Sequence, residues 1–290
     1  MNLPPLRTHV LLTGIGGYWN ESDPPDPPYL WTVFFKVDGA TVSVVGLAPQ
    51  GNATVVGTEG NEGDLGDAPI SLSAGTWVVP ASLGSFLTTL TAIPAPAPIG
   101  PIPGLIGCVA ILMDWADTPS DAVAAGHAAL NTSIQQGIDQ LIPTFGLKKR
   151  TVTPADITTL IDQVTTAVKN AVLNQLSIWQ KAYLAFGTPD IPLSQAIFIF
   201  NQQQLAASPP TGIPMRLTNT ITVPIGPQGS HTGKTMVAQS WSFAGTIVAD
   251  PFPLSMRRIL TGIGHPPPVR IRSVVGGGQI SVIDWVNAVR

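Results

Sequence analysis

The sequence predicts a mainly β protein with an α insertion: an antiparallel β-sandwich interrupted by a helical hairpin. Short β-like runs separated by proline and glycine fill the two ends of the chain, and the stretch between them has a helical pattern. Strands that recur about every ten residues are typical of a sandwich or a barrel. We therefore expect residues 1–117 and 208–290 to form one discontinuous sandwich domain, with residues 118–207 as the helical insertion.

The strands are predicted from runs of aromatic and β-branched residues that end at turn residues. Tyr29–Asp38 is dense in such residues, and Asp38 with Gly39 supplies a turn. Leu105–Asp114 is almost wholly apolar and is expected to be a buried strand. The proline-rich segment Ala92–Gly107 favours an extended connection over the surface, and a peptide ligand for an aromatic groove is the alternative. The other expected strands are Arg7–Gly14, Ala40–Leu47, Ala53–Thr58, Gly75–Pro80, Arg216–Pro224, Thr235–Ala249, Val269–Val275 and Gln279–Asn287.

Two helices are predicted from their start signals. Thr118–Asp121 and Thr153–Asp156 each place a threonine, an early proline and an acid where a helix begins. The first helix is expected to end near Leu141. The second carries an apolar residue at every third or fourth position over about thirty residues and is expected to end at Gly187. This stripe should pack on the first helix to form a hairpin against the sandwich, and Pro192–Ala207 is expected to form a third helix.

Charge is scarce in this chain. Charged residues make up 11% and hydrophobic residues 44% of the sequence, with a net charge of −3, whereas about 25% charged residues is usual. Such a composition suits a chain that buries much of its surface in an oligomer or particle, or that meets a membrane surface. The alternative is a surface of threonine, serine, asparagine and glutamine. Lysine and arginine are scattered apart from Lys148–Arg150, which argues against nucleic acid as a partner.

The N-terminus lacks the basic start and apolar core of a signal peptide, and no run reaches the ~18 apolar residues of a spanning helix. We expect a soluble protein that is either cytoplasmic or exported by a route that needs no N-terminal signal.

Catalytic motifs are missing. Cys108, the only cysteine, lies in an apolar run and predicts a buried, unreactive thiol. The four histidines have no paired spacing, so a zinc enzyme is not expected. The run Gly229–Thr235 ends like a phosphate-binding loop, but Gln228 stands where that loop needs its first glycine. The sequence therefore favours a protein without enzymatic activity, and a hydrolase with dispersed catalytic residues is one alternative.

The acidic residues cluster in loops. Hard cations such as calcium take six to eight oxygen ligands, many of them from carboxylates on flexible loops. Acidic loops gathered at one end of a sandwich resemble C2-type calcium-binding sandwiches, in layout alone, and their spacing does not match the EF-hand pattern. Calcium is therefore the candidate cofactor, and the commoner role of such acids in a charge-poor protein is to solubilise turns. The candidate metal ligands are Glu21, Asp23, Asp26, Glu62, Asp64, Asp67, Asp114 and Asp117.

Two tryptophans lie beside the acidic loops. Trp19 and Trp115 are the aromatic residues that we expect to be exposed, and they are candidate anchors for a protein partner. Together these features favour a binding or assembly protein, a component of a larger particle or a secreted apparatus. Another alternative is a membrane-active, toxin-like protein that uses the helical hairpin 118–187.

Overall fold

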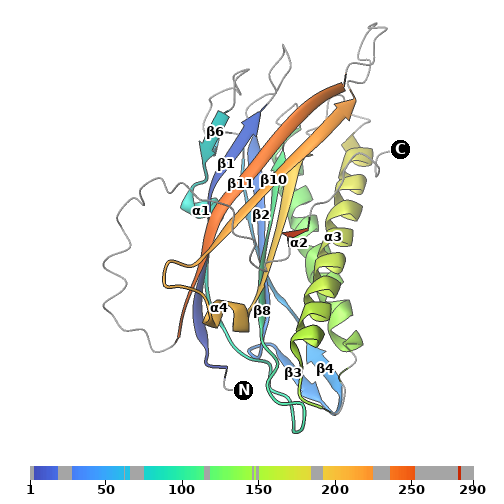
Figure 1. The fold of residues 1–290 in the computed structure, drawn as a ribbon. Coiled ribbons are helices and arrows are strands. Elements are labelled where there is room, and N and C mark those ends of the chain that lie inside the picture. The colour runs from blue at the N-terminus through green and yellow to red at the C-terminus, as the bar shows by residue number, and fades with distance from the viewer. Residues whose placement is uncertain are drawn as a thin grey trace, which may run out of the picture.

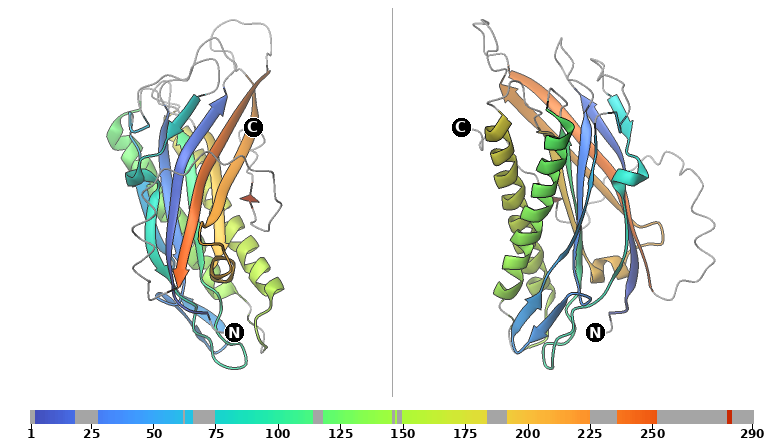
Figure 2. Two further views of the ribbon diagram at one scale, coloured as in Figure 1. Left: turned by 60° about the vertical axis from the view of Figure 1, so that its left-hand side comes forward. Right: turned by 180° about the vertical axis from the view of Figure 1, so that it is seen from behind.

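Two antiparallel sheets and a pair of long helices form three layers (Figures 1 and 2). The structure, a computed structural model, describes residues 3–18, 28–61, 63–65, 75–113, 118–145, 147, 150–183, 192–224, 236–251 and 280–281. Within these residues the predicted architecture is confirmed: the chain is mainly antiparallel β, sandwich-like, with a helical segment inserted.

The first sheet, sheet A, is built around β1 (Leu6–Tyr18). One edge of β1 pairs with β11 (Met236–Pro251), which in turn pairs with β10 (Ile213–Pro224). The other edge of β1 pairs with β6 (Gly75–Val78) and β7 (Ser85–Leu90), which the short helix α1 (Ala81–Gly84) connects. Strands from both ends of the chain therefore meet at β1.

The second sheet, sheet B, has the order β12–β9–β8–β2–β5. Every residue of β2 (Tyr29–Val37) and of β8 (Leu105–Met113) is buried, which confirms the buried strand predicted near Leu105. The flanking strands are β5 (Thr54–Glu59), β9 (Pro192–Asn201) and β12 (Ile280–Ser281), and β3 (Val42–Val45) pairs with β4 (Ala48–Gly51) as a separate hairpin.

The third layer consists of α2 (Ser120–Leu141), continued by a 3₁₀ turn (Ile142–Thr144), and α3 (Pro154–Tyr183). The two helices pack on each other and on sheet B, as the apolar stripe predicts. The α3 start signal is also confirmed, because the Asp156 carboxylate accepts hydrogen bonds of 2.8 and 2.7 Å from the backbone nitrogen and the hydroxyl of Thr153.

Sheet B separates two hydrophobic cores. Phe34 faces sheet A and packs in a core with Trp241 and Phe243, whereas its neighbour Phe35 faces the helices and packs in a core with Val168. This alternation follows from the two-residue period of a strand. Because sheet B is covered on both faces, its central strands β2 and β8 are largely apolar, and Thr32 and Lys36 of β2 are the buried exceptions. Among the described residues, only one face of sheet A packs against a core.

One helix prediction is wrong. Pro192–Asn201 is strand β9, and only α4 (Gln202–Ala206) is helical in the segment expected to be a third helix. The aromatic and β-branched residues from Ile197 to Phe200 suit a strand, and β9 pairs along its length with β8. The predicted strand Val269–Val275 and most of Gln279–Asn287 lie outside the described residues.

Candidate functional site

The acidic loops leave the sandwich at one end. Met113 pairs with Tyr29, and Glu59 pairs with Trp31 two residues further along β2. The chain therefore leaves β8 and β5, and enters β2, at the same end of sheet B. These described strand ends flank the loops that hold the candidate calcium ligands.

Of the candidate ligands, only Asp64 belongs to the described residues. Its carboxylate accepts a hydrogen bond of 2.8 Å from the backbone nitrogen of Asn61, and its own backbone nitrogen donates one of 3.1 Å to the Asn61 carbonyl. In the structure Asp64 thus closes a turn. No group of three potential metal ligands is present in the described part of the chain. The candidates that lie outside the described residues are Glu21, Asp23, Asp26, Glu62, Asp67, Asp114 and Asp117, together with Trp19 and Trp115.

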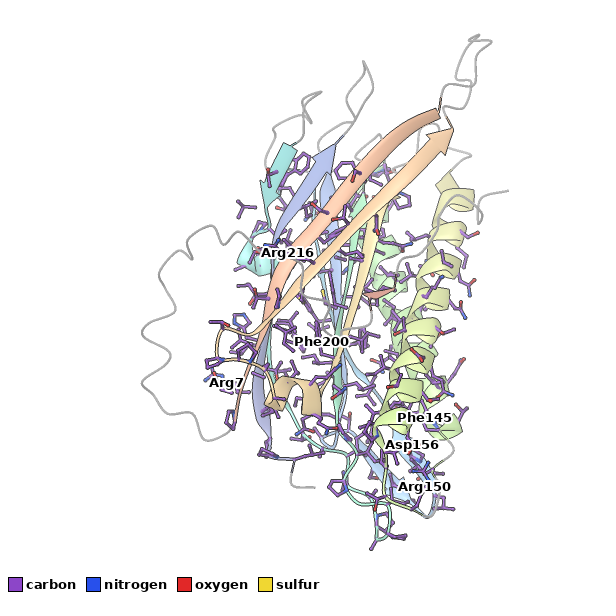
Figure 3. All side chains as sticks on the ribbon, in the orientation of Figure 1. Arg7, Phe145, Arg150, Asp156, Phe200 and Arg216 are labelled. Carbon is purple, nitrogen blue, oxygen red and sulfur yellow. The ribbon has the colours of Figure 1, made fainter. Side chains whose placement is uncertain are left out.

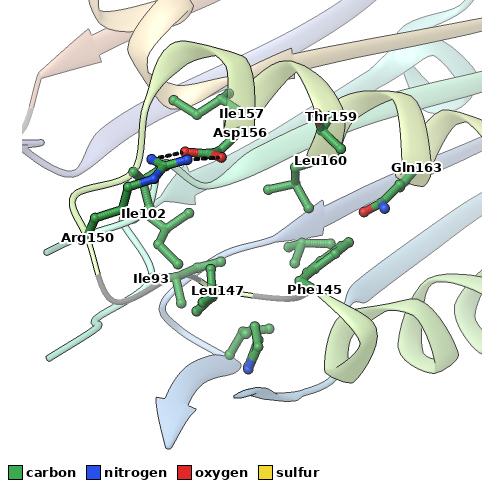
Figure 4. A pocket seen from close by; sticks show the side chains of 14 residues that line it. Ile93, Ile102, Phe145, Leu147, Arg150, Asp156, Ile157, Thr159, Leu160 and Gln163 are labelled. Carbon is green, nitrogen blue, oxygen red and sulfur yellow. Dashed lines mark hydrogen bonds and ion pairs between the residues drawn. The ribbon is translucent and has the colours of Figure 1, made fainter. Parts of the chain in front are cut away.

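A pocket of about 240 Å³ lies at the other end of the molecule (Figures 3 and 4). This is the end where Val37 pairs with Leu105 and where α3 begins. Four stretches of chain form the pocket: the region from the end of β2 to β4, the segment around Ile93 and Ile102, the connection between the helices, and the first turns of α3.

The floor of the pocket is apolar and buried. Val37, Val42, Ile93 and Ile102 are all members of the core between sheet B and the helices. Ile93 and Ile102 exchange two backbone hydrogen bonds of 2.8 and 3.0 Å, which holds their side chains at the same level. The pocket is therefore the open end of this core, where side chains leave space unfilled.

An ion pair lies at the mouth. Arg150 donates hydrogen bonds of 2.7 and 2.9 Å from its two terminal nitrogens to the two carboxylate oxygens of Asp156. These bonds, and those from Thr153, hold the pKa of Asp156 well below its usual range. The same contact raises the pKa of Arg150. Both side chains are partly exposed, at 42% and 36%, so the pair is solvated as well as mutually neutralised.

Two histidines have polar contacts elsewhere. On the outer face of sheet A, His9 Nε2 lies 2.8 Å from Ser85 Oγ. Under α2, His127 Nε2 lies 3.3 Å from the Thr32 carbonyl. Burial lowers the pKa of both imidazoles, which keeps them neutral near pH 7. Neither histidine lines the pocket, so neither is placed to act on a molecule bound there.

No protein-family model, curated protein or solved structure matches the chain.

Sequence reasoning did not predict the pocket. The sequence shows Asp156 only as the acid of a helix start signal and Arg150 only as the last residue of a short basic run. The residues that form the floor are ordinary apolar residues from distant parts of the chain. Only their packing in three dimensions distinguishes them.

Proposed function

We propose that this protein is a non-enzymatic binding and assembly protein that associates with copies of itself or with a protein partner through the outer face of sheet A. The observation that carries this proposal is the unequal covering of the two sheets. Sheet B lies between sheet A and the helices (Figure 2) and has a core on both faces, whereas the described residues of sheet A that alternate with its core residues are less buried and face outward.

The outward residues suit a protein contact. Val78 on β6 is 80% exposed and Leu87 on β7 is 52% exposed. Few charges accompany them: Arg7 and Arg216 lie on β1 and β10 (Figure 3), and Asp250 lies opposite Arg7 on β11. A face that combines exposed apolar groups with little charge loses little solvation when it is covered.

The edges of sheet A add a second mode of contact. In the described part of the chain, β6, β7 and β10 each pair with a strand on one side only. Unpaired backbone groups at such an edge are able to pair with a strand from another chain. An assembly that uses this face and its edges accounts for the low charge of the whole sequence.

The oligomeric state tests the proposal. Light scattering coupled to size exclusion should show that the average mass of the wild-type protein rises with concentration. Val78→Asp combined with Leu87→Asp should keep the protein monomeric, because it places charge on the face. Ile178→Asp is the matched control, since Ile178 is 59% exposed but lies on α3. Two results would show that the outer face of sheet A is not the contact surface. One is a wild type that stays monomeric and captures no partner, and the other is equal association of the sheet A variant and the Ile178 control.

Calcium binding at the acidic end is part of the same proposal. This part of the proposal is supported by the strand ends that flank the acidic loops, which lie at one end of sheet B, so a calcium ion there would take its ligands from several loops. Thermal unfolding in millimolar calcium, compared with EDTA and with magnesium, tests it. A rise in Tm specific to calcium would show binding to the folded state. At least one of Asp23→Asn, Asp64→Asn and Asp114→Asn should abolish that rise. Equal Tm values in all three solutions would leave the acids as turn residues.

The membrane-active alternative is less well supported. No helix in the described residues is long and apolar enough to cross a membrane. Val164, Val168, Val172 and Leu176 on α3 are fully buried, and exposing each would cost about 1.5–3 kcal/mol. Release of the helical hairpin would thus cost about as much as the whole fold provides, typically 5–15 kcal/mol. If the protein caused dye to leak from anionic or neutral liposomes, that result would support the membrane-active alternative.

A further inference from the structure

We infer that the pocket at the start of α3 binds a small, uncharged apolar molecule that carries one hydrogen-bonding end, such as a medium-chain alcohol. The site lies between α3 and the β3–β4 hairpin, on the helical side of sheet B. It is therefore separate from the outer face of sheet A and from the acidic loops, and it goes beyond the assembly function proposed above.

The floor of the pocket favours an apolar ligand over water. Val37, Val42, Ile93 and Ile102 are each at most 4% exposed. The backbone groups of Ile93 and Ile102 are already bonded to each other. A buried water typically needs about three hydrogen bonds; these apolar side chains offer it none, and the amide hydrogens of Ile93 and Ile102 are already used by each other's carbonyls. Water above this floor is therefore easily displaced, and an apolar group that replaces it regains the missing packing contacts.

The size of the pocket limits the ligand. An apolar cavity of about 150 Å³ holds benzene, and the volume here is about 240 Å³. Pockets for drug-sized ligands start at about 300 Å³. The pocket thus fits a substituted single ring or a chain of several methylene groups, and it is too small for a large polycyclic ligand.

The charges at the mouth favour an uncharged ligand. Arg150 and Asp156 bind each other through two hydrogen bonds (Figure 4). Thr153 also donates to Asp156. An ionised head group that binds Arg150 or Asp156 would have to break the hydrogen bonds between these two side chains. Gln163 and Thr159 are exposed, uncharged polar residues that line the pocket. The Thr159 hydroxyl already donates a hydrogen bond of 3.0 Å to the Ala155 carbonyl, so it offers a ligand hydroxyl an acceptor, whereas the Gln163 amide offers both a donor and an acceptor.

A series of straight-chain primary alcohols from butanol to decanol, titrated into the full chain by calorimetry, tests the inference. Each added methylene group should tighten binding about fourfold, until the pocket is full and the affinity stops rising within the series. The matching carboxylates at pH 7 should bind more weakly than the alcohols of equal chain length.

Leu160→Trp is the diagnostic variant because Leu160 lines the pocket from α3, and the larger side chain should fill it. Leu173→Trp is the matched control: Leu173 is also a partly buried leucine of α3 packed against the same core, but it does not line the pocket. If circular dichroism shows that Leu160→Trp does not fold, the smaller change Leu160→Phe takes its place.

Two results together support the inference. In the wild type and in Leu173→Trp, the affinity should stop rising at a limiting chain length. In the Leu160 variant, the alcohols should bind at least about tenfold more weakly than in the wild type. Three results would overturn it. The first is that no alcohol binds saturably, and the second is that affinity rises with chain length equally in Leu160→Trp and Leu173→Trp. The third is that carboxylates bind more tightly than alcohols of equal chain length. The last result would assign the site to anionic ligands held by Arg150.

Discussion

Asp139 accepts a hydrogen bond of 2.7 Å from the backbone nitrogen of Ala53, the residue just before edge strand β5. One helical turn earlier on α2, Gln135 donates hydrogen bonds of 2.8 Å to the Ala53 carbonyl and 2.8 Å to the Asp139 carboxylate. The side chains of Gln135 and Asp139 therefore bond the Ala53 carbonyl and nitrogen, which a further strand at this edge would otherwise have bonded. This arrangement caps the start of the sheet B edge, which is one of the ways in which proteins prevent edge-to-edge association.

Removal of the Asp139 carboxylate should destabilise the fold. We expect Asp139→Ala to lower the free energy of unfolding by about 1–2 kcal/mol, because the Ala53 nitrogen and the Gln135 amide each lose a partner. Asp139→Asn keeps one acceptor oxygen and should lose less. Urea unfolding at pH 7 measures both. Equal losses in the two variants would show that charge, and not the hydrogen bond, is responsible.

The buried ion pair between Lys36 and Asp38 should be the most sensitive polar contact of the described residues. Asp38 is 0% exposed, and its carboxylate lies 3.1 Å from the Lys36 ammonium and accepts two bonds of 3.0 Å from Thr91. Asp38→Ala should cost about 3–5 kcal/mol, because it leaves a buried charge without its partner. The double change Lys36→Met with Asp38→Asn should cost less than Asp38→Ala alone. Chemical denaturation compares the two, and a larger loss in the double variant would contradict this account.

Acid should weaken the start of α3. The pKa of Asp156 is lower in the folded protein than its unfolded value of about 3.9. Its contribution to stability is therefore complete above that value and is lost as the pH falls through the lower, folded pKa. Asp156→Asn should remove this part of the acid dependence of Tm, and Arg150→Met should remove most of it. Because both side chains are partly exposed, the effect should shrink at high salt. An unchanged acid profile in Asp156→Asn would disprove it.

Cys108 should report global unfolding. Its thiol is fully buried in β8, and burial raises its pKa far above the usual range. Because the thiolate is the reactive form, a thiol reagent such as DTNB should not label the native protein at pH 8. Labelling should appear with the urea unfolding transition. Fast labelling without denaturant would show that β8 opens locally, and Cys108→Ala provides the blank.

The helices and the buried strands were the most predictable parts of the fold. The apolar stripe of α3 follows from the spacing of residues within one helix, and the contact between Thr153 and Asp156 at its start joins residues three apart. Both features are local, so the sequence alone is enough to predict them. Strand β9 was harder to predict. It is buried on both faces, so it lacks the alternation of a half-buried strand, and its first residues, from Pro192 to Ala196, are equally compatible with a helix.

The candidate sites were less predictable than the fold. Val37, Ile102, Phe145 and Leu160 come from four separate stretches of chain, and nothing in their local sequence shows that they enclose a pocket. The acidic loops have the opposite character: their composition is visible in the sequence, but cation binding depends on distances between loops, which composition does not determine.

The central position of β1 affects how the chain folds as it leaves the ribosome. Sheet B, apart from β12, and both long helices come from Tyr29–Asn201, so they are able to form first. The face of sheet B that includes Phe34 still needs Trp241 and Phe243 of β11 to cover it. At roughly 5–20 residues per second, synthesis from Asn201 to Pro251 takes roughly 3–10 s. During that interval β10 and β11 do not yet cover that face of sheet B, so the incomplete fold exposes more apolar surface than the finished one.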